Sequence, residues 1–302
     1  VQTPNTMLFL CLLVGASSVS VQVLIPLAAH LSSDEKRGQV LGNIMAGLLL
    51  GILLARPVAS IIADHFGWRA VFFFAAGCMV FIALVIHFAI PKRLPTHNTR
   101  YFALLRSLKS LVIGQPVLRQ RAFYQGLMFA SFSLFWTTVP VVLAREYGFS
   151  QTQIALFALV GAAGAVAAPI VGRLADKGYT YEMSLLAKVI ALLCFLPSLF
   201  DLPNGIIILA LTGVLIDFAV QANMVLGQRV IYSLEPQSRA RLNAIYMTSI
   251  FLGGAVGSLI ASSLYEFGGW ESIALVAAAM PLIALIGFVY SAKKEKQKAH
   301  TA

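Results

Sequence analysis

Long apolar stretches, separated by short segments rich in charge, Gly and Pro, make up most of the chain. About 20 helical residues, each rising roughly 1.5 Å, cross a hydrocarbon core of roughly 30 Å, and most of the stretches have this length. Lipid offers no partners for free backbone N–H and C=O groups, and the stretches are too long for barrel strands. The pattern therefore predicts nine transmembrane helices, at residues 7–29, 38–62, 68–90, 120–143, 151–172, 183–200, 205–231, 242–265 and 271–291.

The composition agrees with an all-α integral membrane protein. Apolar residues make up 59% of the 302 residues and charged residues only 11%, and the mean hydropathy is +0.84. Soluble domains have about 25% charged residues, so a water-soluble core and a nucleic-acid-binding module are excluded. The three cysteines, Cys11, Cys78 and Cys194, are odd in number and isolated in apolar runs, which excludes a disulfide framework. The sequence predicts no cofactor and no metal site.

Basic residues are distributed unevenly between the two sets of alternate loops. Of the 22 Lys and Arg residues, 18 lie in one set of loops and in the C-terminal tail, and only Arg69 and Arg145 lie in the opposite set. Since basic residues concentrate on the cytoplasmic side, the long central loop and the C-terminus are predicted to be cytoplasmic. The net charge of +10 is then mostly an orientation signal. Residues 101–111 in the central loop read as an amphipathic helix that contacts anionic lipid at the cytoplasmic surface.

An internal repeat relates the two ends of the chain. A shift of 202 residues places the helices at 38–62 and 68–90 on those at 242–265 and 271–291 without a gap. The matched positions are Arg37 with Arg239, Gly51 with Gly253, Ala59-Ser60 with Ala261-Ser262, and Gly67-Trp68 with Gly269-Trp270. A shared Arg start, small-residue middle and Gly-Trp turn at one offset indicate duplication. Parallel repeats of this kind build transporters from two like halves.

The repeat predicts that three helices are missing from the first half, because residues 7–29 align with 205–231. The helices without upstream counterparts are those at 120–143, 151–172 and 183–200. The expected domains are an incomplete N-terminal bundle of three helices at 1–90, a cytoplasmic linker at 91–119, and a C-terminal six-helix bundle with a basic tail at 120–302. We interpret the chain as a truncated or interrupted form of a twelve-helix protein.

Two motifs resemble signatures of the major facilitator superfamily. Residues 172–178 read Gly-Arg-Leu-Ala-Asp-Lys-Gly, which is similar to the cytoplasmic loop signature G-x-L-A-D-[RK]-x-G with one residue fewer before the last Gly. Residues 47–57 read Gly-x3-Gly-x3-Ala-Arg-Pro and resemble the Gly-rich antiporter signature of the fifth family helix. Arg56 stands where that pattern has Gly, and Ala59-Ser60 replace a Gly pair, so the antiporter match is partial.

The resemblance covers essentially the whole chain, read as a major facilitator fold that lacks the first three of twelve transmembrane helices. In particular, the chain resembles bacterial proton-coupled efflux transporters of the drug-antiporter and arabinose-efflux type. The resemblance implies a secondary transporter that moves a small organic solute outward against proton entry by alternating access. It also implies a multi-pass protein of the bacterial inner (plasma) membrane, with a small molecule and protons as partners.

Asp217 is the leading candidate for a proton or substrate site. A charged carboxylate near the middle of a membrane helix costs about 2.5 to 3.5 kcal/mol, so it should face a polar cavity, find a partner or be protonated. Gln221, one helical turn further on, lies near the same face of the predicted helix. The alternative is a structural hydrogen bond between two packed helices.

Three further residues are candidates for the substrate pathway. Gln125 and Trp136 belong to a polar and aromatic set on the helix at 120–143, which is suited to line a cavity; aromatic residues more often anchor helix ends. Arg56 lies roughly 9 Å from the middle of its helix. It either reaches the outer interface or turns inward as a counter-charge for an anionic substrate or for Asp217.

The loop signature implies a gate. In such loops of the superfamily, the Asp lies near a helix N-terminus of the opposite half and complements its exposed N–H groups and dipole. For Gly172, Arg173 and Asp176, the corresponding recipient is the helix that starts at Arg37. This contact exists only when the cytoplasmic side is closed, so it would bias the rocking equilibrium. The alternative is a solvated, charged turn.

Small residues recur at every fourth position on two helices, which lets helix backbones approach closely. The stripes contain Gly47 and Gly51 on the helix at 38–62, and Gly253 and Gly257 on the helix at 242–265. The first stripe is predicted to pack against the helix at 151–172. The partner of the second should lie in the missing helices, so this glycine face is expected to be exposed or to self-associate.

Three other functions compete with the transporter. The sequence contains no H-E-x-x-H pair and no G-x-S-x-G elbow, so a membrane-embedded enzyme is not expected. The internal repeat argues against a receptor or assembly protein. The missing helices favour a non-functional relic, because the first helix of the family lines the cavity and half of the gating-loop pair is absent.

Overall fold

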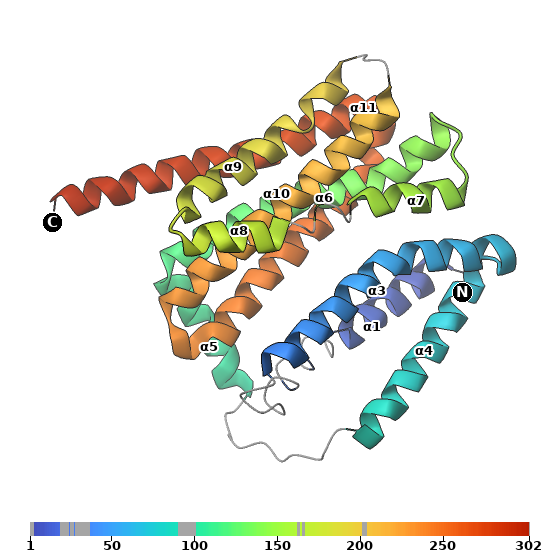
Figure 1. Ribbon diagram of the computed structural model, residues 1–302, viewed down its shortest axis with the longest axis horizontal. Helices are drawn as coiled ribbons and strands as arrows, with labels where there is room; N and C mark the ends of the chain where they lie inside the picture. The colour runs from blue at the N-terminus through green and yellow to red at the C-terminus, as the bar shows by residue number, and fades with distance from the viewer. Residues whose placement is uncertain are drawn as a thin grey trace. The chain divides into compact units, whose positions relative to one another are not determined.

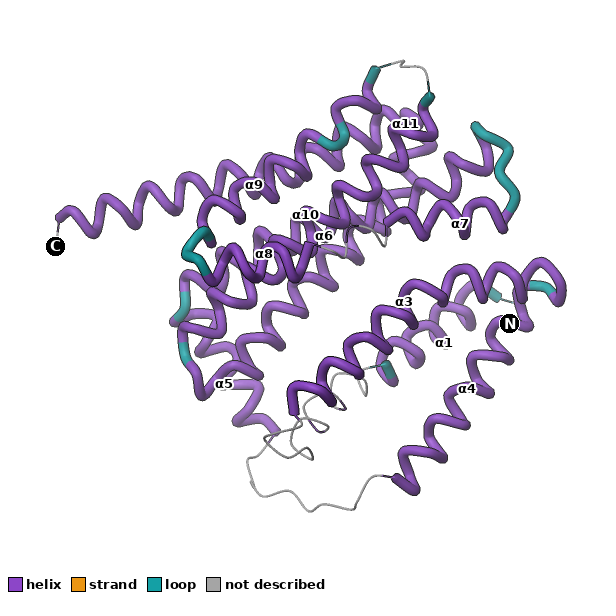
Figure 2. Tube along the Cα trace, in the orientation of Figure 1, coloured by secondary structure: helices purple, strands orange, loops and turns teal. Residues whose placement is uncertain are grey.

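The computed structural model describes residues 3–18, 24, 27, 37–89, 101–161, 164, 167–200 and 204–301. Every regular element among these residues is a helix, as Figures 1 and 2 show. The chain divides into two compact units, residues 1–59 and 60–302. The described elements are α1 (Pro4–Ser17), α3 (Arg37–Phe66), α4 (Trp68–Ala89), α5 (Tyr101–Gly114), α6 (Pro116–Arg145), α7 (Gln151–Gly161), α8 (Ala167–Asp176), α9 (Thr180–Leu193), η2 (Leu196–Leu199), α10 (Gly205–Leu234), η3 (Pro236–Ser238) and α11 (Arg239–Thr301).

Five helical stretches among the described residues are long and apolar enough to cross a membrane. They are Trp68–Ala89, Pro116–Arg145, Thr180–Leu199, Gly205–Leu234 and Arg239–Lys294. Their length and composition confirm an all-α, multi-pass membrane protein. Of the helix predicted at 7–29, the structure describes mainly α1, and most of its second half lies outside the described residues.

The Gly-Trp turn of the internal repeat has the same backbone character in both copies. Helix α3 begins at Arg37, ends at Phe66 and is followed by Gly67, whose φ is 79°. Helix α11 begins at Arg239, and its helical geometry is interrupted at Gly268 and Gly269, where Gly269 has a φ of 59°. A positive φ strains residues with a Cβ, which explains why both turns use Gly. Thus α11 is two helices joined at a kink, as the repeat predicts.

The signature at residues 172–178 is helical for most of its length, which corrects the expectation of a loop. Within the helix predicted at 151–172, the structure describes α7, which ends at Gly161, and α8, which begins at Ala167 and continues to Asp176. The N–H of Tyr179 bonds the carbonyl of Leu174 (3.2 Å), and that of Gly178 bonds the carbonyl of Ala175 (3.0 Å). With a φ of 96° at Gly178, this is a Schellman C-cap, so Gly178 ends the helix.

Helices α6, α9, α10 and α11 lie side by side and enclose the main apolar core (Figure 1). Phe135 of α6, Phe195 at the end of α9, and Ile216 of α10 are fully buried there together with Ile273 of α11. The core side chains come from elements far apart in sequence, so this bundle fixes the positions of the polar residues that α6, α9 and α10 carry into it.

The glycine face of α11 is packed, which corrects the expectation that its partner lies in missing helices. A Cβ on Gly253 would lie 2.0 Å from the carbonyl oxygen of Gly126, and one on Gly257 would lie 2.2 Å from that of Ala130. Both contacts are with α6, because α6 has small residues at the facing positions. Gly47 and Gly51, by contrast, are exposed on α3, and their predicted packing against the helix at 151–172 stays a prediction.

The amphipathic helix predicted at 101–111 is confirmed as α5 (Tyr101–Gly114). Its C-terminal end is anchored to the bundle, since Leu111 is buried against Leu118 and Tyr246. The guanidinium of Arg119 donates to the carbonyl oxygens of Val112 (2.7 Å) and Ile113 (2.6 Å), which are otherwise unpaired at a helix end. The division of the chain at 1–90, 91–119 and 120–302 remains a prediction, and part of that linker lies outside the described residues.

Candidate functional site

Asp217 and Trp136, two of the predicted site residues, form a hydrogen bond across the contact between α10 and α6. The indole Nε1 of Trp136 donates to Oδ1 of Asp217 at 2.7 Å. Trp136 is 8% exposed, and Asp217 is half-buried. An indole N–H can only donate, so Oδ1 of Asp217 is the acceptor in this hydrogen bond. A carboxylate is therefore fixed in the interior of a membrane helix by a specific partner.

Gly161 at the end of α7 and Gly164 approach this pair closely. A Cβ on Gly161 would lie 2.5 Å from Oδ2 of Asp217 and 2.5 Å from the Trp136 ring. A Cβ on Gly164 would lie 2.5 Å from the Cβ of Asp217. The backbone thus covers one side of the Asp217–Trp136 pair. The run of small residues at 158–168 was the available sequence signal, but it identifies only close packing and not the side chains packed against it.

Gln125, another predicted residue, is fully buried and linked to α10 by two hydrogen bonds. Its Nε2 donates to the carbonyl oxygen of Val220 at 3.3 Å, and its Oε1 accepts from Nδ2 of Asn223 at 2.5 Å. Asn223 was not among the predicted residues. A neutral amide in a membrane helix is a weak signal, because such side chains often bond only to a neighbouring helix.

Lys188 of α9 is the main functional candidate that the sequence prediction missed. Its side chain is fully buried, and Nζ donates to Oδ1 of Asn223 (2.6 Å) and to the carbonyl oxygen of Ser184 (3.0 Å). Nζ also lies 4.3 Å from the centroid of the Phe288 ring. A lone Lys inside an apolar run was the signal, since ionisable residues in membrane helices usually mark function.

Arg121 extends the positive charge around Lys188. Its Nη1 donates to Oγ of Ser184 at 3.1 Å, and its Cζ lies 5.1 Å from the centroid of the Phe288 ring. Phe288 is therefore contacted by two basic side chains. We refer to Lys188, Arg121, Asn223, Ser184 and Phe288 as the Lys188 cluster. Asn223 is six residues from Asp217 on α10, which is about 9 Å along the helix axis.

The predicted gate residues lie at the end of α8. Asp176 forms an ion pair with Arg229 of α10, and both side chains are exposed. Arg173 is also exposed, and Gly172 is half-buried in the same helix. The predicted recipient at Arg37 lies in the other unit, and its side chain is outside the described residues. An ion pair with α10 was not foreseen, because Arg229 is more than fifty residues away in sequence.

Of the other predicted site residues, Gln221 is half-buried, and among the described residues its side chain has no hydrogen-bond partner. The side chain of Arg56 lies outside the described residues, so its two predicted orientations stay open. No group of three His, Cys, Asp or Glu side chains is placed to hold a metal ion in the part of the chain that the structure describes.

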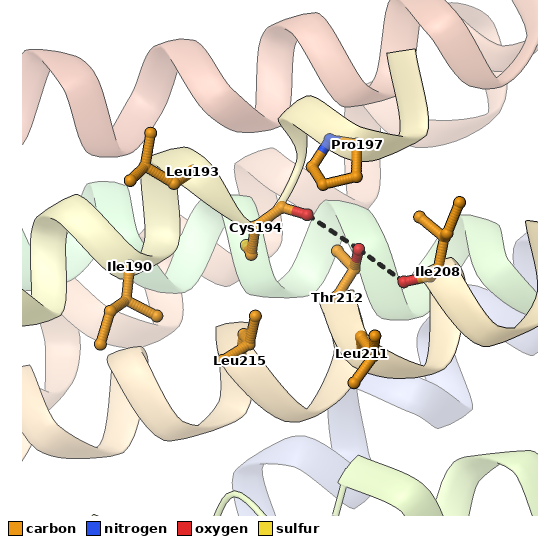
Figure 3. Close-up of a pocket in the computed structure, with 8 residues that line it drawn as sticks. All are labelled: Ile190, Leu193, Cys194, Pro197, Ile208, Leu211, Thr212 and Leu215. Carbon is orange, nitrogen blue, oxygen red and sulfur yellow. Dashed lines mark hydrogen bonds between the residues drawn. The ribbon is translucent and has the colours of Figure 1, made fainter. Parts of the chain in front are cut away.

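An apolar cavity of about 250 Å³ lies between α9 and α10 (Figure 3). Its lining consists of Ile190, Leu193, Cys194, Pro197, Ile208, Leu211, Thr212 and Leu215. Leu215 and Asp217 are two positions apart, about 200° around the helix, so the cavity and Asp217 are on opposite faces of α10. The cavity has no charged lining residue and is separate from the polar site.

Thr212 makes both hydrogen bonds that are drawn in the cavity (Figure 3). Pro197 lacks an N–H and turns the end of α9 into the 3-10 helix η2. The carbonyl oxygen of Cys194 at this helix end therefore accepts a hydrogen bond from the hydroxyl of Thr212 at 2.9 Å. The Thr212 hydroxyl is shared with the carbonyl of Ile208, also at 2.9 Å. It is a structural bond between the two helices.

Comparison with known proteins identifies the family. A family model described as Major Facilitator Superfamily matches residues 1–200 and 121–302, which together cover the chain. The chain is 41% identical over 275 residues to "Uncharacterized transporter YgaY" of Escherichia coli O157:H7, covering 91% of this chain and 70% of that protein. It is 30% identical over 268 residues to "Probable transporter SCO4007" of Streptomyces coelicolor, covering 88% and 62%.

The chain therefore belongs to the major facilitator superfamily and is a membrane transporter, not an enzyme. A solved structure of a bacterial homolog of the human lysosomal transporter Spinster, inward-facing and unoccupied, shares 14% identity with a TM-score of 0.43. The structural alignment covers 86% of this chain and 70% of the Spinster homolog. That likeness is too weak to add to the assignment.

Proposed function

We propose that the chain is a secondary active transporter that exports a small organic solute in exchange for protons by alternating access. Asp217 is the proton site, and Trp136, Gln125, Gln221 and Arg56 are further residues of the substrate or proton pathway. The observation that carries this proposal is the hydrogen bond from Trp136 to Asp217, which joins α6 and α10 inside the apolar bundle.

Protonation of Asp217 would change the strength of the link between the two helices. A hydrogen bond to a charged acceptor contributes about 1.5 to 3 kcal/mol, and one between neutral groups about 0.5 to 1.5 kcal/mol. Binding a proton at Asp217 therefore weakens the contact between α6 and α10 by about 1 kcal/mol. A proton that loosens one helix contact can bias a two-state equilibrium, which is what coupled transport requires.

Proteoliposomes containing the full chain test this proposal. The vesicles contain a pH-sensitive dye, and a pH gradient is imposed across the membrane. Organic cations, anions and neutral solutes are then added one at a time, and we expect at least one of them to elicit proton flux. We expect Asp217→Asn to abolish this flux, since an amide cannot carry the proton, and Trp136→Phe to reduce it by removing the only donor of that side chain. Glu271→Gln, which changes an exposed carboxylate, is the matched control. Flux in Asp217→Asn equal to that of the wild type would refute the proton site.

Asp176 and its neighbours are proposed to act as the gate of the cytoplasmic side. In the closed state Asp176 would contact the start of α3 near Arg37, and in the structure it pairs with Arg229. Arg229 would thus hold Asp176 when the gate contact is absent. We expect Arg229→Gln to shift the equilibrium toward the closed state, measurable as slower labelling of a cysteine placed in the transport pathway. Unchanged labelling would contradict this competition.

A second candidate is a non-functional relic of such a transporter. The chain covers 70% and 62% of the two relatives described above. Absence of flux with every solute in wild-type proteoliposomes would support the relic. Proton flux with any of the solutes would contradict it.

A further inference from the structure

We propose that the Lys188 cluster binds the oxyanion of an amphipathic organic anion, and that this anion is the exported solute. This inference rests on the proposed function, because it names the substrate class of the same helix bundle. It is carried by a fully buried Lys188 whose polar contacts are all with neutral groups, and by a second basic side chain beside it.

The contacts of Lys188 fit a charged ammonium group. An ammonium has three donors, and here two of them meet oxygen atoms of Ser184 and Asn223 while Nζ lies 4.3 Å from the centre of the Phe288 ring. A neutral amine has only two N–H groups and would turn its lone pair toward the negative face of that ring. The ring therefore favours the cation.

The amide groups next to Lys188 are aligned to stabilise a positive charge. Asn223 presents its oxygen to Lys188 and donates its N–H to Gln125, and Gln125 in turn donates to the carbonyl of Val220. All hydrogen bonds in this chain point away from the ammonium. Chains of aligned hydrogen bonds polarise one another, so part of the positive charge is spread toward α6 and α10.

Lys188 has no carboxylate partner among the described residues. A buried charge without a counter-charge is strongly destabilising, so its retention in a membrane helix indicates a functional role. Arg121 adds a second positive charge near the first, and both contact Phe288. The ring of Phe288 lies where an anionic partner of Lys188 would be expected. A cation–π contact with this ring stabilises a cation less than an ion pair with an oxyanion does.

The surroundings of the cluster suit a ligand with an apolar body. Tyr181 stacks on Phe288 with ring centroids 5.1 Å apart, and Tyr124 meets the same ring edge-on at 6.1 Å. Tyr181 is 39% exposed and Phe288 only 4%, so the ring stack leads from the surface of the bundle to Lys188. Once Phe288 moves aside, an aromatic carboxylate would place its oxyanion on Lys188 and its ring in the position of the Phe288 ring, next to Tyr181 and Tyr124.

An anionic lipid headgroup carries the same oxyanion chemistry. Lys188 is enclosed by side chains of α6, α9, α10 and α11 and has no exposed surface. A headgroup attached to the bilayer would have to enter the bundle to reach it, whereas a free solute enters a transport pathway by definition. We therefore commit to a free organic anion, and the lipid is an outcome of the test.

The test measures binding to the purified full chain in phosphatidylcholine nanodiscs, without a proton gradient. The probes are 4-phenylbutyrate and its uncharged analogue 4-phenylbutyramide, and the readouts are calorimetric affinity and the rise in Tm. We expect 4-phenylbutyrate to bind and the amide not to bind. Lys188→Gln should weaken the binding by about tenfold or more, as expected for loss of a charge-assisted bond. Lys109→Gln, which changes an exposed lysine, is the control.

Asn223→Asp provides an independent variant in case Lys188→Gln does not fold. The new carboxylate replaces the amide oxygen that lies 2.6 Å from Nζ, so it supplies an internal counter-ion. We expect this variant to fold, to show a raised Tm without ligand, and to lose 4-phenylbutyrate binding. Phe288→Leu should instead strengthen binding, because the anion no longer displaces an aromatic ring.

Binding of the probe by Asn223→Asp at wild-type affinity, or absence of binding by the wild type, would overturn the inference. A Lys188-dependent rise in Tm that needs phosphatidylglycerol in the nanodiscs, without binding of 4-phenylbutyrate, would assign the site to a lipid and also overturn it. Lys188-dependent binding without any proton flux would refute only the proposed coupling to protons. Proton flux without probe binding would refute only the anion site.

Discussion

Single hydrogen bonds from polar side chains join the helices of the C-terminal bundle. Three bonds each connect two different helices: Trp136 to Asp217, Asn223 to Gln125, and Thr212 to the carbonyl of Cys194. In a membrane such bonds matter because the apolar environment offers no competing water and little hydrophobic driving force between helices. The bond of Thr212 is the simplest to test, since it lies outside the polar site.

Replacing Thr212 by Val should destabilise the chain by about 1 kcal/mol. Val has nearly the same shape, but it leaves the carbonyl of Cys194 at the end of α9 without its partner from α10. Thr248→Val is the matched control, because the Thr248 hydroxyl is exposed and bonds only within its own helix, to Ala244. Unfolding of both variants in detergent measures the difference. Equal stabilities would show that the Thr212 bond contributes nothing.

At this scale the sequence predicted individual residues and not their pairings. Asp217 was identified because a carboxylate in the middle of a membrane helix costs free energy, and Trp136 because aromatic residues more often lie near helix ends. Their contact depends on how α6 and α10 are aligned, which the sequence does not give. Lys188 carried the same signal as Asp217. A long Lys side chain can reach the interface, so its burial is not evident from its position in the sequence.

Helix packing in the bundle depends on backbone contacts that tolerate no side chain. Gly253 and Gly257 of α11 face Gly126 and Ala130 of α6. The four-residue spacing predicted the stripe on α11 but gave no information about its partner, because periodicity defines a face and not what covers it. Gly126 and Ala130 on α6 have the same four-residue spacing, and this was the sequence signal that could have identified the partner.

Gly253→Ala should therefore destabilise the bundle by about 1 to 3 kcal/mol, as overpacking does in well-packed interiors. A Cβ at this position would overlap the backbone of Gly126, which can relieve the clash only by moving a whole helix. Gly77→Ala is the control, because Gly77 lies on α4 with open space at the position of a Cβ. It should be within about 1 kcal/mol of the wild type or slightly more stable. Similar losses in both variants would contradict the close contact of α6 with α11.

For the whole molecule, hydropathy predicted the fold class and the two signature motifs predicted the family, and both are confirmed. Orientation in the membrane is still an expectation from the distribution of basic residues. The bacterial inner membrane is likewise proposed from the family resemblance. Neither follows from helix geometry, because a bundle has the same internal contacts whichever end faces the cytoplasm.

Alkaline phosphatase fusions would measure the orientation. We expect a fusion after Gly148, between α6 and α7, to be active, and one after Gln237, between α10 and α11, to be inactive. The enzyme needs the oxidising side of the membrane, and the basic residues place the first loop there and the second in the cytoplasm. The reverse pattern would invert the predicted topology, including the cytoplasmic C-terminus.

The kink at Gly268 and Gly269 has a mechanical consequence for the entire bundle. Only two non-helical residues separate two long helices there. Because so short a connection allows little independent movement, we expect the two arms, the helices before and after the kink, to tilt together. Next to the kink, Arg145 and Tyr265 clamp α11 to the end of α6 through Glu266 (2.7 Å) and Glu146 (2.9 Å). We expect this end to act as a pivot when the two arms move. Any swing of the paired arms is then smallest at the kink and largest at the opposite ends, toward Arg239 and the C-terminal tail.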